Sequence, residues 1–309
     1  MKKSEFTLPS NDGMTDLHCI LWEPETEPKA LFQLVHGMCE YIDRYSEFAE
    51  YLTERGIVVL GHDHLGHGDS VTDKQKYGFF AEKDGARIVI DDMRTVTLYG
   101  KTRFTGIPNF ILGHSMGSFM VRRYLTVYGR DVNGAVIMGT GMVPGIVAGL
   151  GKAVAGALKG FCGGLYRSKL VTNMAIGGYN KPFEPCRTNS DWLSRNTENV
   201  DKYEADDRCG FMFTVSAYKD FFTVMGLIAK ESVYTKTPRE LPVLITSGAV
   251  DPVGGTAAVE ALEKQYKGIG MTNVTTRIYP EDRHEILNEV DREQVYADIW
   301  FWLKGAMQK

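Results

Sequence analysis

The sequence has no strong excess of charge of either sign. Its 309 residues include 35 basic and 39 acidic side chains, which gives a formal net charge of −4 with histidines counted as neutral. Proteins that bind nucleic acids usually concentrate positive charge, which displaces counterions from phosphate. This sequence contains no block of like charges, so we expect no nucleic-acid partner.

Cysteine is scarce, and its spacing fits neither a disulfide framework nor a structural zinc site. The chain has 5 cysteines, an odd number, and no Cys-x-x-Cys pair. Disulfide-rich domains and zinc sites normally need cysteines in paired patterns. We therefore expect reduced thiols, which are typical of a cytoplasmic protein. The five residues are Cys19, Cys39, Cys162, Cys186 and Cys209.

Signals for export or for crossing a membrane are also lacking. Two lysines follow Met1, but no apolar run comes behind them, so we expect no signal peptide. No uninterrupted apolar stretch reaches the roughly 18–20 residues that a bilayer-spanning helix needs. Repeats and low-complexity tails are absent as well, and we expect the whole length to fold.

What the chain does contain is a regular alternation of short apolar runs and helical stretches. A turn signal at 11–13 separates 4–10 from 17–23 and predicts an N-terminal antiparallel hairpin. From residue 30 on, runs suited to strands buried on both faces alternate with helical patterns. This alternation predicts an α/β fold with a mostly parallel, doubly wound sheet. The expected strands are 30–35, 57–60, 109–112, 134–138, 243–246 and 274–279, and the expected helices are 45–54, 84–100 (with Asp84 as N-cap), 117–128, 255–266 and 291–304.

One long interval interrupts this alternation. Residues 142–238 separate two predicted strands by far more chain than a crossover helix requires. Long insertions in compact domains usually form lids or additional subdomains. We therefore divide the chain into a first core part at 1–141, a helical cap or lid insertion at 142–238, and a second core part at 239–309.

The cap begins with a glycine-rich apolar segment that has two interpretations. Gly145–Gly164 contains seven glycines and is interrupted by Lys152 and Lys159. One interpretation is a helix of small residues packed closely on its neighbours. The other is a mobile amphipathic flap that makes transient contact with a membrane surface, because each interior glycine costs a helix ~1 kcal/mol relative to alanine. The two lysines argue against a helix that spans the membrane.

A serine stands in a setting that is typical of an enzymatic nucleophile. Gly113 and Gly117 flank Ser115 two residues to either side, which is the pattern G-x-S-x-G. The pattern predicts a sharp turn that points the hydroxyl outward, and the glycines remove Cβ atoms that would clash there. An apolar strand pattern precedes it at 108–112 and a helical pattern follows at 119–128, which is the setting that the motif requires. We therefore predict Ser115 as the nucleophile.

A serine nucleophile needs a base, and the base needs an acid that orients it. Among seven histidines only His284 follows the last predicted strand, where folds that present serine in this way carry the base. Asp251 directly follows the preceding strand and is the predicted acid, although an Asp-Pro pair also favours plain turns. Glu281 and Asp282 are rival acids, but they lie too close to His284 in sequence to approach its far nitrogen easily.

Acyl transfer also needs two fixed N–H donors for the developing oxyanion. The turn supplies the first, the backbone N–H of Met116. The loop after strand 30–35 supplies the second, and Met38 is our candidate there. The stretch 62–69 has the density of a metal site, but glycines and a turn interleave it, so no metal is expected. Its residues are His62, Asp63, His64, His67 and Asp69.

Together these residues resemble the monoacylglycerol lipase and lysophospholipase branch of the α/β-hydrolases. The resemblance spans most of the core, in the family's order and spacing. It implies a triad of Ser115, Asp251 and His284, oxyanion amides at Met38 and Met116, a cap over an apolar acyl pocket, and an ester substrate. The matching pieces are His36-Gly37 with Glu40; Arg44-Tyr45; Asp63-His64 with Gly66-His67-Gly68 and Ser70; residues 113–117; Gly248 with Asp251-Pro252-Val253-Gly254; and Arg283-His284-Glu285 with Asn288-Glu289.

The chain departs from this family in places. Tyr41 stands where the family often has histidine, and Ser118 stands where a third glycine is common. Neither residue is expected to touch the chemistry directly. The cap matches only loosely, so the identity of the substrate does not carry over from the resemblance.

The resulting prediction is a serine hydrolase that needs no cofactor and cleaves carboxylic esters through an acyl-enzyme. Single-chain lipid esters, such as monoacylglycerols or lysophospholipids, are the expected substrates. The alternatives are a short-chain or aromatic-ester carboxylesterase, a peptidase that acts at chain N-termini, and a slow-turnover ligand receptor; the oligomeric state is not predicted. The acyl groove would use Phe161, Leu165, Phe211, Phe213, Phe221, Phe222 and Met225, whereas a peptidase would use Glu184, Glu198, Glu204, Asp206 or Asp207.

Overall fold

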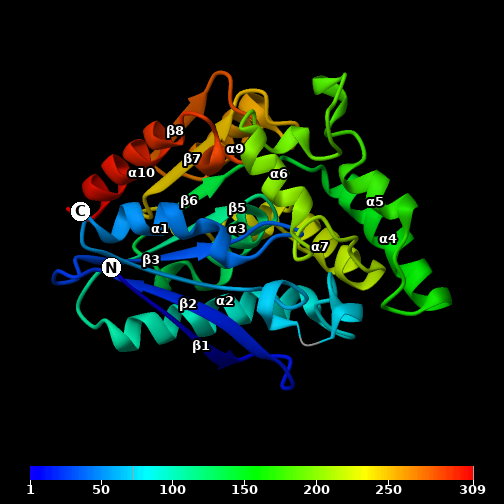
Figure 1. The fold of residues 1–309 in the computed structure, drawn as a ribbon, viewed down its shortest axis with the longest axis horizontal. Coiled ribbons are helices and arrows are strands. Elements are labelled where there is room, and N and C mark those ends of the chain that lie inside the picture. Colours follow the sequence, from blue (N-terminus) through cyan, green and yellow to red (C-terminus); the bar gives the residue numbers. More distant parts are fainter. Residues whose placement is uncertain (72, 309) are drawn as a thin grey trace.

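The computed structural model describes residues 1–71 and 73–308. Its centre is one eight-stranded sheet in the order β1-β2-β4-β3-β5-β6-β7-β8 (Figure 1). β2 pairs antiparallel with β1 and β4, and all other neighbours are parallel. The predicted fold class is therefore confirmed. The strands are β1 Lys2–Pro9, β2 Asp16–Glu23, β3 Ala30–Val35, β4 Ile57–His62, β5 Asn109–His114, β6 Gly134–Met138, β7 Val243–Gly248 and β8 Val274–Tyr279.

The N-terminal hairpin forms around the predicted turn. β1 and β2 pair over all eight residues of each strand. In the turn, Asp12 Oδ1 accepts hydrogen bonds of 2.8 Å from the backbone N–H groups of Met14 and Thr15. Aspartate favours turns because its carboxylate binds backbone amides in this way.

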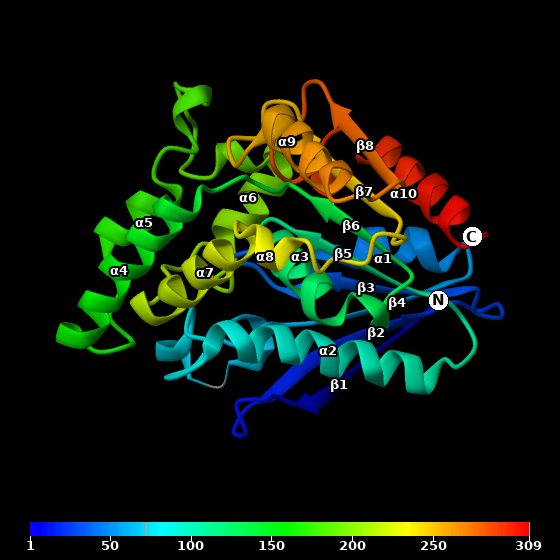
Figure 2. The same cartoon turned by 180° about the vertical axis from the view of Figure 1, so that it is seen from behind.

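Helices cover both faces of the sheet (Figures 1 and 2). The first and last helices pack on one face and bury Phe48, Leu52, Val295 and Ile299 there. Three others pack on the opposite face, where they share a second buried cluster. The five core helices all lie where the sequence predicts them. They are α1 Ser46–Thr53, α2 Gly85–Arg103, α3 Met116–Tyr128, α9 Gly255–Gly268 and α10 Arg292–Ala306, and the short 3₁₀ helices are Ile42–Tyr45, Gly68–Ser70, Lys74–Lys76, Gly129–Asp131, Lys181–Phe183, Asp191–Leu193 and Ile286–Asn288.

The expectation that every parallel strand is buried on both faces is wrong for β8. Every residue of β3 to β7 is buried, but β8 alternates, with Thr275 and Arg277 exposed. Among the described residues, β8 is the last strand of the sheet and pairs with β7 alone. A strand at an edge has less cover, so its side chains show a period of two.

Asp84 does not cap α2, contrary to the prediction. It has a left-handed backbone (φ 57°) and its side chain makes no capping hydrogen bond. Asp220, which lies on helix α7 (Val215–Ile228) of the insertion, instead accepts a hydrogen bond from the N–H of Ala86. Burial raises the pKa of Asp220 to about 6. A Cβ on Gly85 would lie 2.2 Å from Asp220 Oδ2, so glycine at this position leaves room for the incoming carboxylate.

Five helices occupy the chain between β6 and β7, and α4 to α7 lie beyond the carboxyl ends of the parallel strands (Figures 1 and 2). This arrangement encloses the space above the sheet. The boundaries 142–238 given above stay a prediction. The five are α4 Gly145–Cys162, α5 Lys169–Ile176, α6 Thr197–Ala205, α7 Val215–Ile228 and α8 Glu231–Tyr234.

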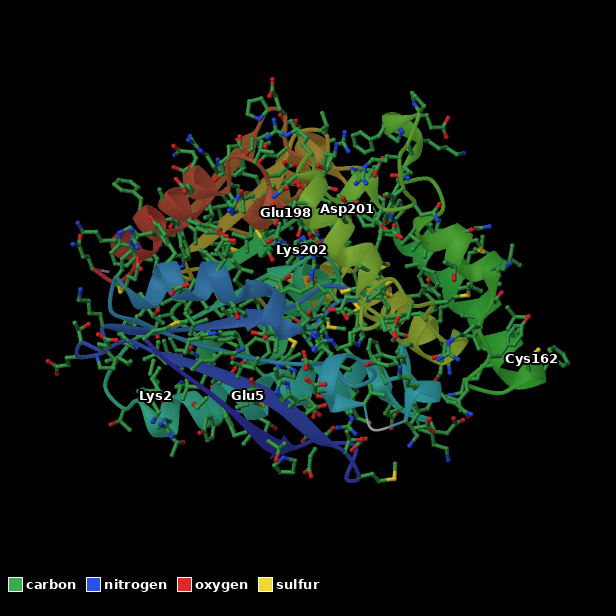
Figure 3. All side chains as sticks on the ribbon, in the orientation of Figure 1. Lys2, Glu5, Cys162, Glu198, Asp201 and Lys202 are labelled. Carbon is green, nitrogen blue, oxygen red and sulfur yellow. The ribbon has the colours of Figure 1, made fainter. Side chains whose placement is uncertain are left out.

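The glycine-rich segment forms α4, and its two sides differ. Ala148, Gly151 and Ala155 are buried, and a Cβ on Gly151 would lie 2.8 Å from the ring of Phe222 on α7. The opposite side is apolar and exposed, and Phe161 is 91 % exposed. α4 ends at Cys162, at an outer corner of the cap (Figure 3). By length and composition alone α4 also meets the criteria for a membrane span, and 17 % of it is buried.

The capping arrangement at α2 yields a test of the fold. Asp220→Ala removes the carboxylate that binds the Ala86 N–H, and loss of such a cap lowers the free energy of unfolding by about 1 kcal/mol. Asp84→Gly, in a left-handed position where glycine is at ease, should not lower it. Urea unfolding of both variants measures the difference. An equal loss in the two variants would contradict this account.

Candidate active site

Ser115 lies in a strained turn between β5 and α3. Its backbone has φ 53° and ψ −121°, which non-glycine residues rarely adopt. A Cβ on Gly113 would lie 2.3 Å from the carbonyl oxygen of Gly117, and one on Gly117 would lie 2.2 Å from that of Val35. Both positions therefore require glycine. This is the sharp turn that the G-x-S-x-G pattern predicts.

His284 and Asp251 lie on the loops that follow β8 and β7. Nδ1 of His284 lies 3.0 Å from each carboxylate oxygen of Asp251. The carboxylate also accepts hydrogen bonds from the N–H of Val253 (2.9 Å) and the hydroxyl of Ser247 (3.0 Å). Burial alone would raise the pKa of Asp251, but His284 and these donors together hold it below its usual value. The structure thus pairs the two predicted residues.

The other nitrogen of the His284 ring, Nε2, differs from Nδ1 in its contacts. Nε2 is buried, and within 1–71 and 73–308 it has no hydrogen-bond partner. Both residues line the same cavity. Because Nδ1 faces Asp251, Nε2 is the nitrogen that is free to accept a proton. Catalytic hydrogen bonds are often loose until substrate is bound.

The two predicted oxyanion donors lie beside Ser115. Met116 is the first residue of α3, where an N–H has no partner within the helix. Met38 stands between two engaged amides, since the N–H of Gly37 binds Glu40 Oε1 (2.6 Å) and that of Cys39 binds His67 Nε2 (3.3 Å). Both methionines line the cavity.

Buried histidines support the loop that carries Met38. His67 accepts the hydrogen bond from Cys39 described above, and His36 Nε2 accepts one of 3.0 Å from the N–H of His64. Burial lowers the pKa of His67 to about 4 and that of His62 to about 3. The lowered pKa values favour the neutral rings, and two histidines, His67 and His36, accept hydrogen bonds from backbone amides.

Of the other residues in that stretch, Asp63 is buried and serves three donors. Its carboxylate binds the ring of His18 at 2.8 Å and the N–H groups of Ile42 (2.7 Å) and Asp69 (2.9 Å). His18, Asp63 and Asp69 are close enough together to hold a metal ion. Since the oxygens of Asp63 already bind three donors, its observed role is to join this stretch to β2, which carries His18, and to the 3₁₀ helix that begins at Ile42.

A buried ion-pair network lies behind the site, and the sequence analysis gave it no role. Arg44 binds Glu40 and Glu285, each at 2.7 Å. Glu40 also contacts the ring of His114 at 3.3 Å. Burial would lower the pKa of His114, but Glu40 raises it above the usual value. The network joins the loop of Met38 to the loop of His284. A sequence signal existed, since Glu40, Arg44 and Glu285 all belong to the pieces that match the family.

The cavity at Ser115 has a volume of about 330 Å³, and apolar side chains from the cap form most of its wall. Four of the seven predicted groove residues line it: Phe211, Phe221, Phe222 and Met225. Phe213 is buried but does not line it, and Phe161 and Leu165 are exposed outside. Helices α4 and α5 contribute further walls that were not predicted, namely Val147, Met174, Ala175 and Ile176.

The acidic residues considered for a peptidase lie elsewhere. Glu198, Asp206 and Asp207 line a separate polar groove of about 840 Å³ beside α6, where Glu198 pairs with Lys202 at 2.8 Å (Figure 3). Glu184 and Glu204 line neither space. The carboxylates that do line the cavity, Glu40 and Glu285, are both bound to Arg44. The described residues thus place no free carboxylate in the cavity for a substrate amine.

Comparison with known protein families places this arrangement in a class. The family described as serine aminopeptidase, S33 (Hydrolase_4) matches residues 26–291. The chain belongs to this family of α/β-hydrolases.

Individual relatives are more specific. The chain is 30 % identical over 296 residues to monoglyceride lipase from Mus musculus, which covers 89 % of this chain and 85 % of that protein. It is 25 % identical over 302 residues to monoacylglycerol lipase from Mycolicibacterium smegmatis, with 97 % of each chain covered. A solved carboxyl esterase from Bacillus coagulans in complex with glycerol superposes with a TM-score of 0.92, at 27 % identity and 99 % coverage of both chains. The predicted resemblance is confirmed, and the chain is a carboxylic ester hydrolase.

The neutral histidines make stability depend on pH. Burial lowers the pKa of His67 from 6.5 to about 4. As the pH is lowered below 6.5, His67 therefore gains a proton in the unfolded chain before it does so in the folded chain, and the free energy of unfolding decreases. Between pH 6.5 and 5 this amounts to about 2 kcal/mol. Urea unfolding at pH 7 and at pH 5 measures how much free energy of unfolding is lost between the two pH values. We expect this loss to be about 2 kcal/mol smaller in His67→Gln than in the wild type, because the amide oxygen of glutamine accepts the same hydrogen bond but does not bind a proton. Equal losses would contradict the role given to His67.

Proposed function

We propose that Ser115, His284 and Asp251 form a catalytic triad that hydrolyses carboxylic esters through an acyl-enzyme. Ser115 Oγ attacks the ester carbonyl carbon while His284 Nε2 takes its proton. Nε2 then returns the proton to the departing alcohol oxygen. Water attacks the acyl-enzyme by the same route and releases the acid. The pairing of His284 Nδ1 with Asp251 supports this assignment, because it leaves Nε2 free toward the cavity.

The backbone amides of Met38 and Met116 are proposed to hold the oxyanion in both steps. A donor of this kind contributes about 2.7–4 kcal/mol to transition-state stabilisation where it has been removed by mutation. Support comes from the close approach of the two loops, since a Cβ on Gly37 would lie 3.1 Å from Ser115 Cβ. The rigid N-terminus of α3 also needs no reorganisation during the reaction.

The proposed substrates are esters of single-chain lipids. The observation that carries this proposal is the apolar cavity, which Ser115 lines and which is walled by α4, α5 and α7 of the cap, the segment 142–238. Its volume falls near the lower end of ordinary ligand pockets, which also suits a shorter or aromatic acyl group. The relatives named monoglyceride lipases favour the lipid ester.

The cap is also proposed to contact lipid surfaces transiently. The outer side of α4 exposes Ile146 (88 %), Leu150 and Phe161. Val147, on the same helix, is exposed and also lines the cavity. An apolar helix face beside the cavity would place the opening of the cavity at the lipid surface in which the substrate is dissolved. With all five cysteines free, we propose a reducing, cytoplasmic compartment.

Chain-length dependence tests the substrate. We expect kcat/KM on monoacylglycerols and other esters to rise from acetyl toward long acyl chains, since each buried methylene contributes about 0.8 kcal/mol. Ser115→Ala should lower kcat at least about 10⁴-fold. A maximum at acetyl or butyryl would favour the small-ester carboxylesterase. Ser115-independent turnover would contradict the triad, and no turnover on any ester would favour the receptor.

Liposome binding tests the surface contact. The double variant Ile146→Ser, Leu150→Ser should bind monoolein-containing phosphatidylcholine vesicles at least about 10-fold more weakly, because two exposed apolar side chains are lost from the contact. Hydrolysis of a soluble short-chain ester should not change. The matched control is Phe301→Ser, an exposed residue on α10. Unchanged binding in the double variant, or an equal loss in the control, would overturn the proposal.

A further inference from the structure

One cap segment is bound directly to the loop that carries His284. The guanidinium of Arg283 donates to the carbonyl oxygen of Asp191 at 2.5 Å, and the N–H of Glu285 donates to that of Leu193 at 2.7 Å. The two neighbours of His284 therefore bind the two neighbours of Trp192. These contacts set residues 192 and 284 opposite each other.

The ring of Trp192 packs on the ring of His284. The two ring centres lie 4.9 Å apart, with 37° between the planes. Tyr179 packs on Trp192 in turn, at 5.0 Å. The backbone N–H of Trp192 donates to Asn180 Oδ1 at 2.8 Å. The indole is thus held from several sides, and it also lines the cavity at Ser115.

Arg195 fixes the other end of the same cap segment. Its backbone N–H and its side chain bind the carboxylate of Glu289 at 3.0 and 3.2 Å, and its guanidinium binds Asp282 at 2.5 Å. Glu289 also accepts a 3.0 Å hydrogen bond from the N–H of Arg283. The cap segment and the histidine loop therefore form one bonded unit around the imidazole.

From this arrangement we infer that Trp192 is a positioning residue for the catalytic histidine. The indole holds the imidazole in the orientation that directs Nδ1 to Asp251 and Nε2 to the cavity. It also stabilises the imidazolium that forms when His284 takes the proton of Ser115, because a cation within about 6 Å of an indole face is attracted by the ring. The inference rests on the proposed function, in which His284 is the base.

Trp192 could instead serve only to shape the acyl cavity that it lines. The positioning role and the shaping role predict different changes in kcat and KM. A residue that only shapes the acyl cavity changes KM for long acyl chains. A residue that supports the imidazolium changes kcat for every ester, even one too small to fill the cavity. An aromatic substitute would keep the second effect, whereas an aliphatic one of similar apolarity would lose it.

The kinetic test compares Trp192→Leu with Trp192→Phe on 4-nitrophenyl acetate, whose acyl group is too small to need the cavity. Trp192→Leu should lower kcat about 10-fold with little change in KM, and Trp192→Phe should stay within about 3-fold of the wild type. The matched control is Trp300→Leu on α10, away from the cavity, which should leave kcat unchanged. Equal kcat in wild type and Trp192→Leu, or equal losses in Trp192→Leu and Trp192→Phe, would overturn the inference.

A structural test needs no turnover. If the indole holds the imidazole, the crystal structure of Trp192→Leu should show His284 Nδ1 displaced from the two carboxylate oxygens of Asp251, which lie 3.0 Å away in the wild type. An unchanged position of the imidazole in Trp192→Leu would overturn the inference. Failure of the proposed function has a different signature, which is full esterase activity in Ser115→Ala.

Discussion

The guanidinium of Arg44 links the loop that carries Met38 to the loop that carries His284. It binds Glu40, whose other oxygen holds the N–H of Gly37 in the oxyanion loop. It also binds Glu285, the residue after His284. Without this cation two buried carboxylates would lose the positive charge that they share, and breaking a buried ion pair in this way costs several kcal/mol. The loop of Met38 and the loop of His284 are therefore held together by one charge, although they are far apart in the sequence.

The same network reaches the cap, since Asn199 on α6 donates to Glu285 at 2.7 Å. The cap thus has two parts that differ in the kind of contact they make with the rest of the protein. The part around Trp192 and Arg195 is tied to the core by hydrogen bonds and ion pairs. The part formed by α4 presents an exposed apolar side and packs mainly through small residues on α7. One part is bonded to the loop of His284, whereas the other has an exposed apolar side.

Much of this protein follows from local sequence, and the exceptions have a common cause. The strands, the core helices and the turn at Ser115 are set by apolar periodicity and by glycine, which act over a few residues. The prediction that Asp84 caps α2 is wrong, because the carboxylate that binds the first turn of this helix belongs to Asp220, which lies 136 residues further along the chain. The Trp192 contact also joins distant segments. No periodicity reports such pairs, because they exist only once the chain has folded.

The two edge strands of the sheet expose charged side chains. β8 leaves one side unpaired, and a bare strand edge is a template on which other chains can assemble. Arg277 is exposed along β8, and at the other end β1 exposes Lys2 and Glu5 (Figure 3). An incoming strand would have to strip water from these charges. The alternation that makes β8 less buried than its neighbours therefore protects a sheet with apolar central strands from aggregation.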